Sequence, residues 1–299
     1  RNYSPDGCFL KNLISSDTNA IKIALTGTPI ISKEYNTKDI FGDYIHTYFY
    51  NASIADGYTL RLIREDIGSN YKIKLQEALN SIRVQKGSLK DADVYRVKSY
   101  VQPLLDYIIN DLHEFRVKNN DETLGAMAVC NSKEQAQLMY SLFLEKYADE
   151  DELDNYTDED GSYVYRSISA GELELKKKPC KKGCYRAAII TFDSYNNSKE
   201  TRAKWIELFK DGKVDLLIVF QMLQTGFDAP RLKKLYLHRM VKEHNLLQTL
   251  TRVNRPYKDM KYGHVVDFAN IEEEYSKTNK DYQKELENEV GTENADDTD

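Results

Sequence analysis

The sequence predicts an α/β protein whose core is a parallel β-sheet with helices on its faces. From about residue 123 onward, short apolar runs alternate with longer segments of helical periodicity, the pattern of strands joined by crossover helices. Residues 214–220 are apolar at nearly every position, as in a parallel strand buried on both faces. Residues 136–144 carry apolar side chains three and four positions apart, which indicates one buried helix face.

The elements of this region are expected in a regular order. Ser132 and Gln135 have the spacing of a capping box, so the first helix should begin there. Gly212 follows the second helix as its C′ residue, and Pro256 closes the third. Strands are expected at residues 124–130, 187–191, 214–220, 232–238 and 264–268, and helices at 132–144, 199–209 and 243–255.

The chain before residue 123 is less regular. Residues 20–25 read as a short buried strand and residues 39–44 as a helix. Residues 46–51 and 59–65 read as extended pieces around an Asp-Gly turn. Residues 71–120 are polar and helix-prone with helical apolar spacing, so this stretch is expected to be a helical connector.

Charge and composition limit the classes of function. The net charge is −6, with 42 Lys and Arg against 48 Asp and Glu, which argues against wholesale wrapping of DNA but leaves room for a local basic track. No apolar stretch approaches the roughly 20 residues of a membrane span, and no signal peptide opens the chain. Cys180 and Cys184 lack a second pair, so no metal site is expected, and the sparse thiols fit a reducing cytoplasm.

The expected helix at 243–255 carries the strongest candidate site. At 100° per residue, Gln248, Arg252 and Arg255 point to one side of a helix, opposite its apolar stripe. Guanidinium groups match the geometry of phosphate oxygens, so this face would suit a phosphate. The alternative is an ordinary amphipathic helix with solvated arginines.

The loop after the buried strand at 214–220 is a second candidate, because ligands bind at the carboxyl ends of parallel strands. Gly226 would allow close backbone approach, Thr225 can donate to a phosphate, and Asp228 can orient an arginine or a ribose. The alternative for Asp228 is a simple turn former before Ala-Pro.

Two further junctions follow expected strands. Ser132 and Lys133 open a helix, and a helix N-terminus with a hydroxyl and a lysine is a ready anion site, although Ser132 also suits a plain N-cap. Thr26 and Thr28 lie in a short Thr-Gly-Thr-Pro turn, which taken alone is a weak signal.

Together these pieces resemble the superfamily 2 helicases and translocases. The similar segments are residues 26–29 for motif III, 124–140 for motif IV, 225–228 for motif V, and Gln248-x-x-x-Arg252-x-x-Arg255 for motif VI. In their detailed residue sequences, several segments resemble the R (HsdR) subunit of type I restriction enzymes, a prokaryotic cytoplasmic family. This resemblance is carried by residues 23–30, 41–44, 55–57, 222–230 and 247–255.

The resemblance implies a division of the chain. Residues 1–66 would be the end of a first RecA-like lobe, 67–122 a helical connector, and 123–270 the second RecA-like lobe with an insertion at 147–183. Residues 271–299 would form an acidic, flexible tail. The sequence contains no Gly-x-x-x-x-Gly-Lys-Ser/Thr loop and no Asp-Glu-x-His motif, so both, like the nuclease domain, are expected upstream.

The resemblance also implies a motor function. ATP and Mg²⁺ would be bound mainly by the first lobe, and Arg252 and Arg255 would reach the γ-phosphate with Gln248 as a sensor. Asp228 and Gly226 would lie near the nucleotide, while Thr26, Thr28, Ser132, Lys133 and Thr225 would contact the backbone of double-stranded DNA. Methyltransferase and specificity subunits would be partners, and the isolated fragment would be inactive.

Two alternatives remain at this point. The first is another superfamily 2 enzyme, such as a DNA repair or replication-restart helicase or an RNA helicase. The second is a non-catalytic α/β interaction module whose arginines bind an acidic partner protein. Sequence upstream of Arg1 would distinguish a restriction subunit from another superfamily 2 enzyme. Salt-sensitive binding to duplex DNA would distinguish a DNA motor from an interaction module.

Overall fold

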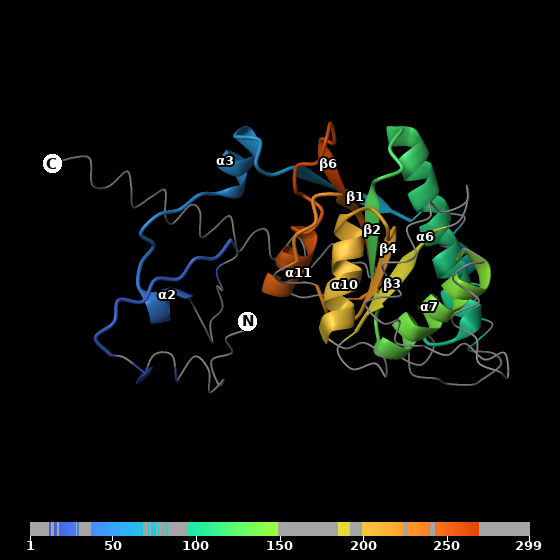
Figure 1. Ribbon diagram of the computed structural model, residues 1–299, viewed down its shortest axis with the longest axis horizontal. Helices are drawn as coiled ribbons and strands as arrows, with labels where there is room; N and C mark the ends of the chain where they lie inside the picture. The colour runs from blue at the N-terminus through green and yellow to red at the C-terminus, as the bar shows by residue number, and fades with distance from the viewer. Residues whose placement is uncertain are drawn as a thin grey trace. The chain divides into compact units, whose positions relative to one another are not determined.

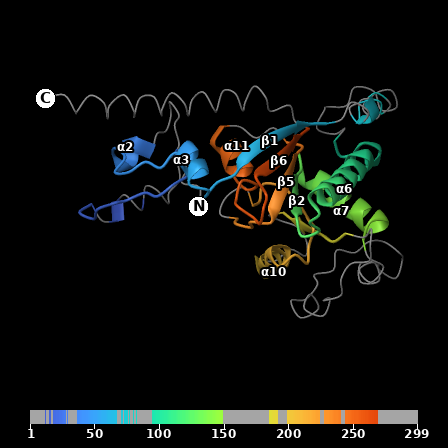
Figure 2. The same ribbon diagram turned by 90° about the horizontal axis from the view of Figure 1, so that it is seen from above.

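The structure is a computed structural model (Figures 1 and 2). It describes residues 12, 15–16, 18–27, 29, 37–67, 71, 73–75, 77, 80, 82, 95–148, 185–191, 199–223, 227–239 and 243–268. The chain divides into two compact units, one formed by residues 1–49 with 274–299 and the other by residues 50–273.

A six-stranded parallel sheet forms the second unit. Its strands are β1 (Arg61–Asp66), β2 (Gly125–Val129), β3 (Ala187–Ile190), β4 (Leu216–Val219), β5 (Leu232–Leu237) and β6 (Tyr262–Asp267). Their order is β1-β6-β5-β2-β4-β3, and every neighbouring pair is parallel. The five strands expected after residue 123 are confirmed, because each apolar run lies in a fully or largely buried strand.

Helices cover both faces of this sheet. Helices α6 (Lys98–Asn119) and α7 (Lys133–Lys146) lie on one face, and α10 (Lys199–Lys210) and α11 (Glu243–Leu250) lie on the other, as both views show. The predicted fold class, a RecA-like α/β lobe with a parallel sheet flanked by helices, is thereby confirmed. The smaller helix α3 (Tyr50–Ala55) precedes β1.

The edge strand β1 comes from a part of the sequence that the prediction grouped with a first lobe. Residues 61–66 pair in parallel with β6 and so complete the sheet of the second unit. Helix α6, expected within a connector, packs against α7 and buries nine apolar or aromatic residues. The assignment of residues 1–60 to a first lobe stays a prediction.

Two expectations in the first 60 residues are wrong. Residues 21–26 form no strand, and the side chains of Ile21 and Leu25 are 92% and 95% exposed, because no described strand lies beside them. Residues 46–49 form neither strand nor helix, and α3 begins at Tyr50. The helix expected at 39–44 corresponds to the shorter α2 (Thr37–Phe41).

Helix ends follow the expected local chemistry. The Ser132 hydroxyl accepts a hydrogen bond from the Gln135 amide at 3.1 Å, and the Gln135 side chain accepts one from the Asn131 amide at 2.7 Å. The Ser132 cap is thus confirmed, whereas Gln135 accepts from the amide one residue before the N-cap and not from the N-cap amide that a complete capping box uses. Gly212 has φ +77° just beyond α10, where the left-handed conformation favours glycine, so its predicted C′ role is confirmed.

Candidate functional site

The helix that carries the candidate arginines is shorter than predicted. Helix α11 ends at Leu250, so residues 251–255, here called the arginine segment, are not helical. The Thr251 hydroxyl and the Arg252 Nε both donate to the Gln248 carbonyl, at 3.0 and 2.9 Å, and so occupy an acceptor of the last turn. The residue before a proline also disfavours helical geometry, and Arg255 precedes Pro256. The predicted alignment of three side chains along one helix face is therefore wrong.

The arginine segment lies at the amino-terminal edge of the sheet. The Leu60 amide, just before β1, donates to the Asn254 carbonyl at 2.6 Å. Lys233, the second residue of β5, donates to the Val253 carbonyl at 3.4 Å. Gly263, the second residue of β6, lies so close to Val253 that an added Cβ would overlap its carbonyl oxygen. The starts of three parallel strands therefore hold the segment.

The loop after β4 reaches the same edge. It leaves the sheet at the carboxyl end of β4 but returns before β5, so Phe227 and Asp228 lie only a few residues ahead of Leu232. The expectation that Asp228 sits at the carboxyl ends of the strands is wrong, because the connection from β4 to parallel β5 must cross back along the sheet.

A hydrogen bond and an ion pair join this loop to the arginine segment. Arg252 Nη1 donates to the Phe227 carbonyl at 2.6 Å, and Arg255 Nε lies 3.5 Å from Asp228 Oδ1. The Phe227 ring is buried and packs near the Phe209 ring, with centroids 6.0 Å apart, which anchors the loop in the core. Three of the predicted residues, Asp228, Arg252 and Arg255, are thus brought together.

The two arginines differ in environment. Arg252 is half-buried, and two of its N–H groups donate to backbone carbonyls. Burial and the nearby charge of Arg255 lower the pKa of its guanidinium, whereas the carboxylate of Asp228 acts in the opposite direction. The side chain of Arg255 is 49% exposed, and its ion pair among the described residues is with the 61% exposed carboxylate of Asp228. Arg252 therefore fastens the loop, whereas Arg255 keeps donors available for a ligand.

A buried lysine that the sequence reading missed supports the segment. Lys233 is fully buried, and its ammonium donates to the carbonyls of Val253 and Arg255. Burial, reinforced by the charge of Arg255, lowers the pKa of Lys233 to about 8. Two consecutive lysines in the apolar strand Leu232–Leu237 were the available signal, because a charged side chain in a buried strand needs a specific partner.

The cluster carries excess positive charge. Among the described residues, Asp228 is the only carboxylate that pairs with Lys233, Arg252 or Arg255. Carbonyl acceptors satisfy hydrogen-bond donors without cancelling their charge, so the field of these cations remains. The arrangement can therefore bind an anion such as a phosphate at the exposed Arg255.

Ser132 and Lys133, which belong to the same unit, do not join this cluster. Ser132 and Lys133 follow β2 at the carboxyl-terminal edge of the sheet, opposite the arginine segment. Thr26 is exposed and belongs to the first unit. Thr28, Thr225 and Gly226 lie outside the described residues. Their roles in binding stay predictions, as does the sensing role of half-buried Gln248.

The described residues offer no group of three or more His, Cys, Asp or Glu arranged for a metal ion. Cys180 and Cys184 lie outside them, and Cys130 is a fully buried thiol whose pKa is raised by burial. In the same part of the chain, none of the helices has both the length and the apolar character to cross a membrane.

A parallel RecA-like lobe with arginines at its edge is the architecture of the superfamily 2 motors. The family model for domain 3 of the type I restriction enzyme subunit R matches residues 121–270, and a SWI2/SNF2 ATPase model matches residues 4–92. The chain therefore belongs to the type I restriction enzyme R subunit family, and the resemblance seen in its motifs is confirmed.

Relatives with curated names agree. A Methanocaldococcus jannaschii protein named as a type I restriction enzyme endonuclease subunit is 30% identical over 88% of this chain and 27% of its own length. A Staphylococcus aureus subunit of the same description is 27% identical over 86% of this chain and 28% of its own. This chain spans about a quarter of the length of these relatives.

Among solved structures, a fragment named as an HsdR subunit of a type I restriction enzyme from Vibrio vulnificus is similar. The TM-score is 0.54 with 19% identity, over 90% of this chain and 44% of that one. At this identity the likeness supports the fold alone.

Proposed function

We propose that this chain is part of the ATP-dependent DNA-translocating motor of a type I restriction enzyme R subunit. The observation that carries the proposal is the link between residues 227–228 and the arginine segment, which presents Arg255 beside excess positive charge. Family membership favours this role over a repair or RNA helicase and over a non-catalytic module.

In this proposal ATP is held mainly by a first lobe, with Mg²⁺ bound there, and the arginine segment meets its phosphates. The positive cluster fits a triphosphate, because Arg255 is exposed and Arg252 and Lys233 add charge behind it. Arg255 would stabilise negative charge on the transferring phosphoryl group. Arg252 would position Arg255 by holding the loop that carries Asp228.

The proposal extends to partners and place. Double-stranded DNA would be the track, and methyltransferase and specificity subunits would complete the enzyme in a prokaryotic cytoplasm. Thr26, Thr28, Ser132, Lys133 and Thr225 remain the candidates for contacts with the DNA backbone, which position a protein without reading sequence.

The test substitutes arginines in the complete R subunit and measures DNA-stimulated ATP turnover. We expect Arg255→Ala to reduce turnover by about 10³-fold or more, the effect of losing an arginine that contacts the transferred phosphate. Arg96→Ala is a matched control, because Arg96 also pairs with an exposed carboxylate, Glu134, at 3.5 Å and is 42% exposed. Near-normal turnover by Arg255→Ala would refute the assigned role.

A second test concerns the isolated chain. Since its sequence has no Gly-x-x-x-x-Gly-Lys-Ser/Thr loop, we expect the pure 299-residue chain to hydrolyse no ATP with or without duplex DNA. Hydrolysis that co-purifies with this chain and is abolished by Arg255→Ala would show that the phosphate cradle lies within it.

A further inference from the structure

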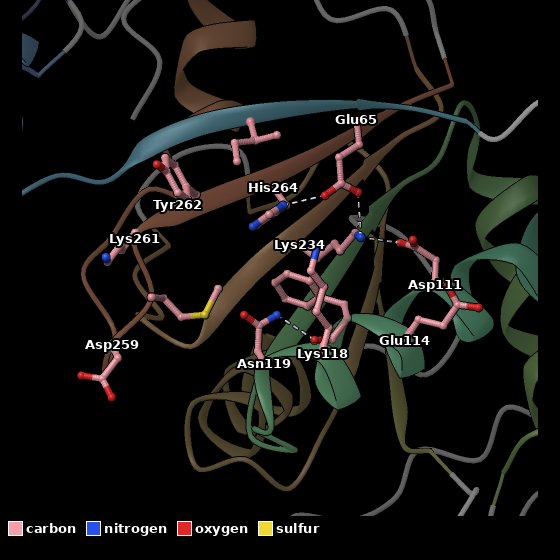
Figure 3. Close-up of a pocket in the computed structure, with 13 residues that line it drawn as sticks. Glu65, Asp111, Glu114, Lys118, Asn119, Lys234, Asp259, Lys261, Tyr262 and His264 are labelled. Atoms are coloured by element: carbon pink, nitrogen blue, oxygen red, sulfur yellow. Dashed lines mark hydrogen bonds and ion pairs between the residues drawn. The ribbon is translucent and has the colours of Figure 1, made fainter.

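A pocket lies on the face of the sheet that α6 covers, beside the edge strands (Figure 3). Its volume is about 640 Å³, which is within the range of small-molecule sites. Strands β1, β5 and β6, the last two turns of α6 and the loop before β6 contribute its walls.

The floor of the pocket is a closed network of charges. Lys234 Nζ lies 2.8 Å from Glu65 Oε2 and 2.8 Å from Asp111 Oδ2. The Tyr236 hydroxyl donates to Asp111 at 2.7 Å. The two carboxylates of the floor share the one ammonium of Lys234, so the floor keeps a net negative charge, and an anion would bind at the lysines of the rim and not on the floor.

This network fixes the orientation of one imidazole. His264 Nδ1 lies 2.6 Å from Glu65 Oε1, so Nδ1 carries the hydrogen and Nε2 is directed toward the pocket (Figure 3). The Phe115 ring stands edge-on to the imidazole with centroids 4.8 Å apart, which further limits its rotation. Three elements, β1, β6 and α6, thus hold His264 in place.

Two lysines supply donors around the same space. Lys118 lies in the last turn of α6, and Lys261 immediately precedes β6. Neither forms an ion pair or hydrogen bond with another described residue, although Glu114 and Asp259 also line the pocket. Figure 3 shows the carboxylates of Glu114 and Asp259 turned away from His264.

Apolar side chains form the remaining wall. Ile63, Met260 and Tyr262 line the pocket, and Tyr262 is 41% exposed, so its ring is accessible from solvent. An aromatic face beside cationic donors suits a ligand that has a planar base and an anionic group, because bases stack on aromatic rings.

We propose that this pocket binds a phosphate ester of nucleotide size, with the phosphate on Lys118 and Lys261, a protonated phosphate oxygen donating to His264 Nε2, and the base against Tyr262. The site is separate from the arginine segment, since Gly263 faces Val253 while its neighbours Tyr262 and His264 face the pocket. The same phosphate chemistry could come from a free mononucleotide or from a DNA strand.

The experiment titrates the 299-residue chain with three probes, inorganic phosphate, dAMP and a short DNA duplex, by calorimetry. The test variant is Lys118→Gln combined with Lys261→Gln, and both positions are exposed, so the fold should persist. Lys210→Gln is the control, because Lys210 is likewise an exposed lysine in the last turn of a helix, α10.

We expect dAMP to bind more tightly than phosphate, and the double variant to weaken it by about tenfold or more through lost charge-assisted hydrogen bonds. His264→Gln should weaken binding to a smaller extent, and Lys210→Gln should leave it unchanged. Binding of duplex alone, lost in the double variant, would identify the phosphate as that of a DNA strand. Absence of binding by all three probes, or binding that the double variant leaves intact, would overturn the proposal.

Discussion

Lys233 and Lys234 are neighbours in β5, yet they stabilise the two faces of the sheet in different ways. Lys233 points to the face of α11 and donates to the backbone carbonyls of Val253 and Arg255. Lys234 points to the face of α6 and pairs with the carboxylates of Glu65 and Asp111. Both side chains are buried, so burial alone does not distinguish them.

The difference lies in the acceptor. A carboxylate neutralises an ammonium, so the network around Lys234 is a closed structural unit. A carbonyl accepts the hydrogen bond but leaves the charge, so the side of Lys233 keeps a positive field that adds to Arg252 and Arg255. The contrast separates a face built for stability from an edge built to attract an anion.

The largest effect is expected for the ion-pair network of Lys234 with Glu65 and Asp111. Lys234→Met leaves Glu65 and Asp111 without their cation, and breaking a buried pair in this way costs about 3–5 kcal/mol. Lys233→Met leaves only carbonyls, whose lost hydrogen bonds cost about 1 kcal/mol each. Urea unfolding of the two variants should show this order, and equal losses would remove the basis of the comparison. Lys213→Met, at a surface pair with Asp211, is the control.

The dependence of folded stability on pH tests the environment of Lys233. Below pH about 8 Lys233 is charged in both states, and its burial opposes folding. Between about 8 and the ordinary 10.5 the folded protein releases this proton while the unfolded chain keeps it, so folded stability should rise with pH. The expected gain of wild type relative to Lys233→Met is about 3 kcal/mol at most, at 1.36 kcal/mol per pKa unit. If the stability difference between wild type and Lys233→Met did not change between pH about 8 and 10.5, the lowered pKa of Lys233 would be contradicted.

A smaller effect is expected at the contact between Gly263 of β6 and Val253 of the arginine segment. Gly263→Ala would place a methyl group against the Val253 carbonyl, and relief requires movement of the arginine segment. We expect a loss of about 1–3 kcal/mol, typical of overpacking, together with reduced ATP turnover in the complete subunit. Gly212→Ala, which places an L side chain at φ +77° just beyond α10, is the control for lost stability without loss of turnover.

The sequence predicted regular elements well because their signals are local. The continuous apolar run of β4 and the Ser132 cap of α7 depend on residues within a few positions of each other. Segments whose geometry depends on distant partners were not predictable in this way. Helix α11 ends early where side chains occupy the Gln248 carbonyl and Pro256 follows, and the arginine segment is then held by β1, β5 and β6.

The candidate site shows the same limit. Gln248, Arg252 and Arg255 were grouped through helix geometry that the structure lacks. Asp228 was chosen as a residue that can orient an arginine or a ribose, and its ion pair with Arg255 is compatible with the first of these roles. The pocket near His264 escaped notice because its residues come from three strands and one helix, with no recognisable spacing in the sequence. Glu65 and His264, for example, are 199 positions apart.

The position of β6 between β1 and β5 has a consequence for synthesis. Arg64 and Asp267, joined by a hydrogen bond across the two strands, are 203 positions apart, so β1 emerges from the ribosome about 10–40 s before its neighbour at typical elongation rates. During that interval β1 cannot join the sheet, because the strand that separates it from β5 does not yet exist. Chaperone occupancy of nascent chains should therefore persist until residues near 267 have left the exit tunnel.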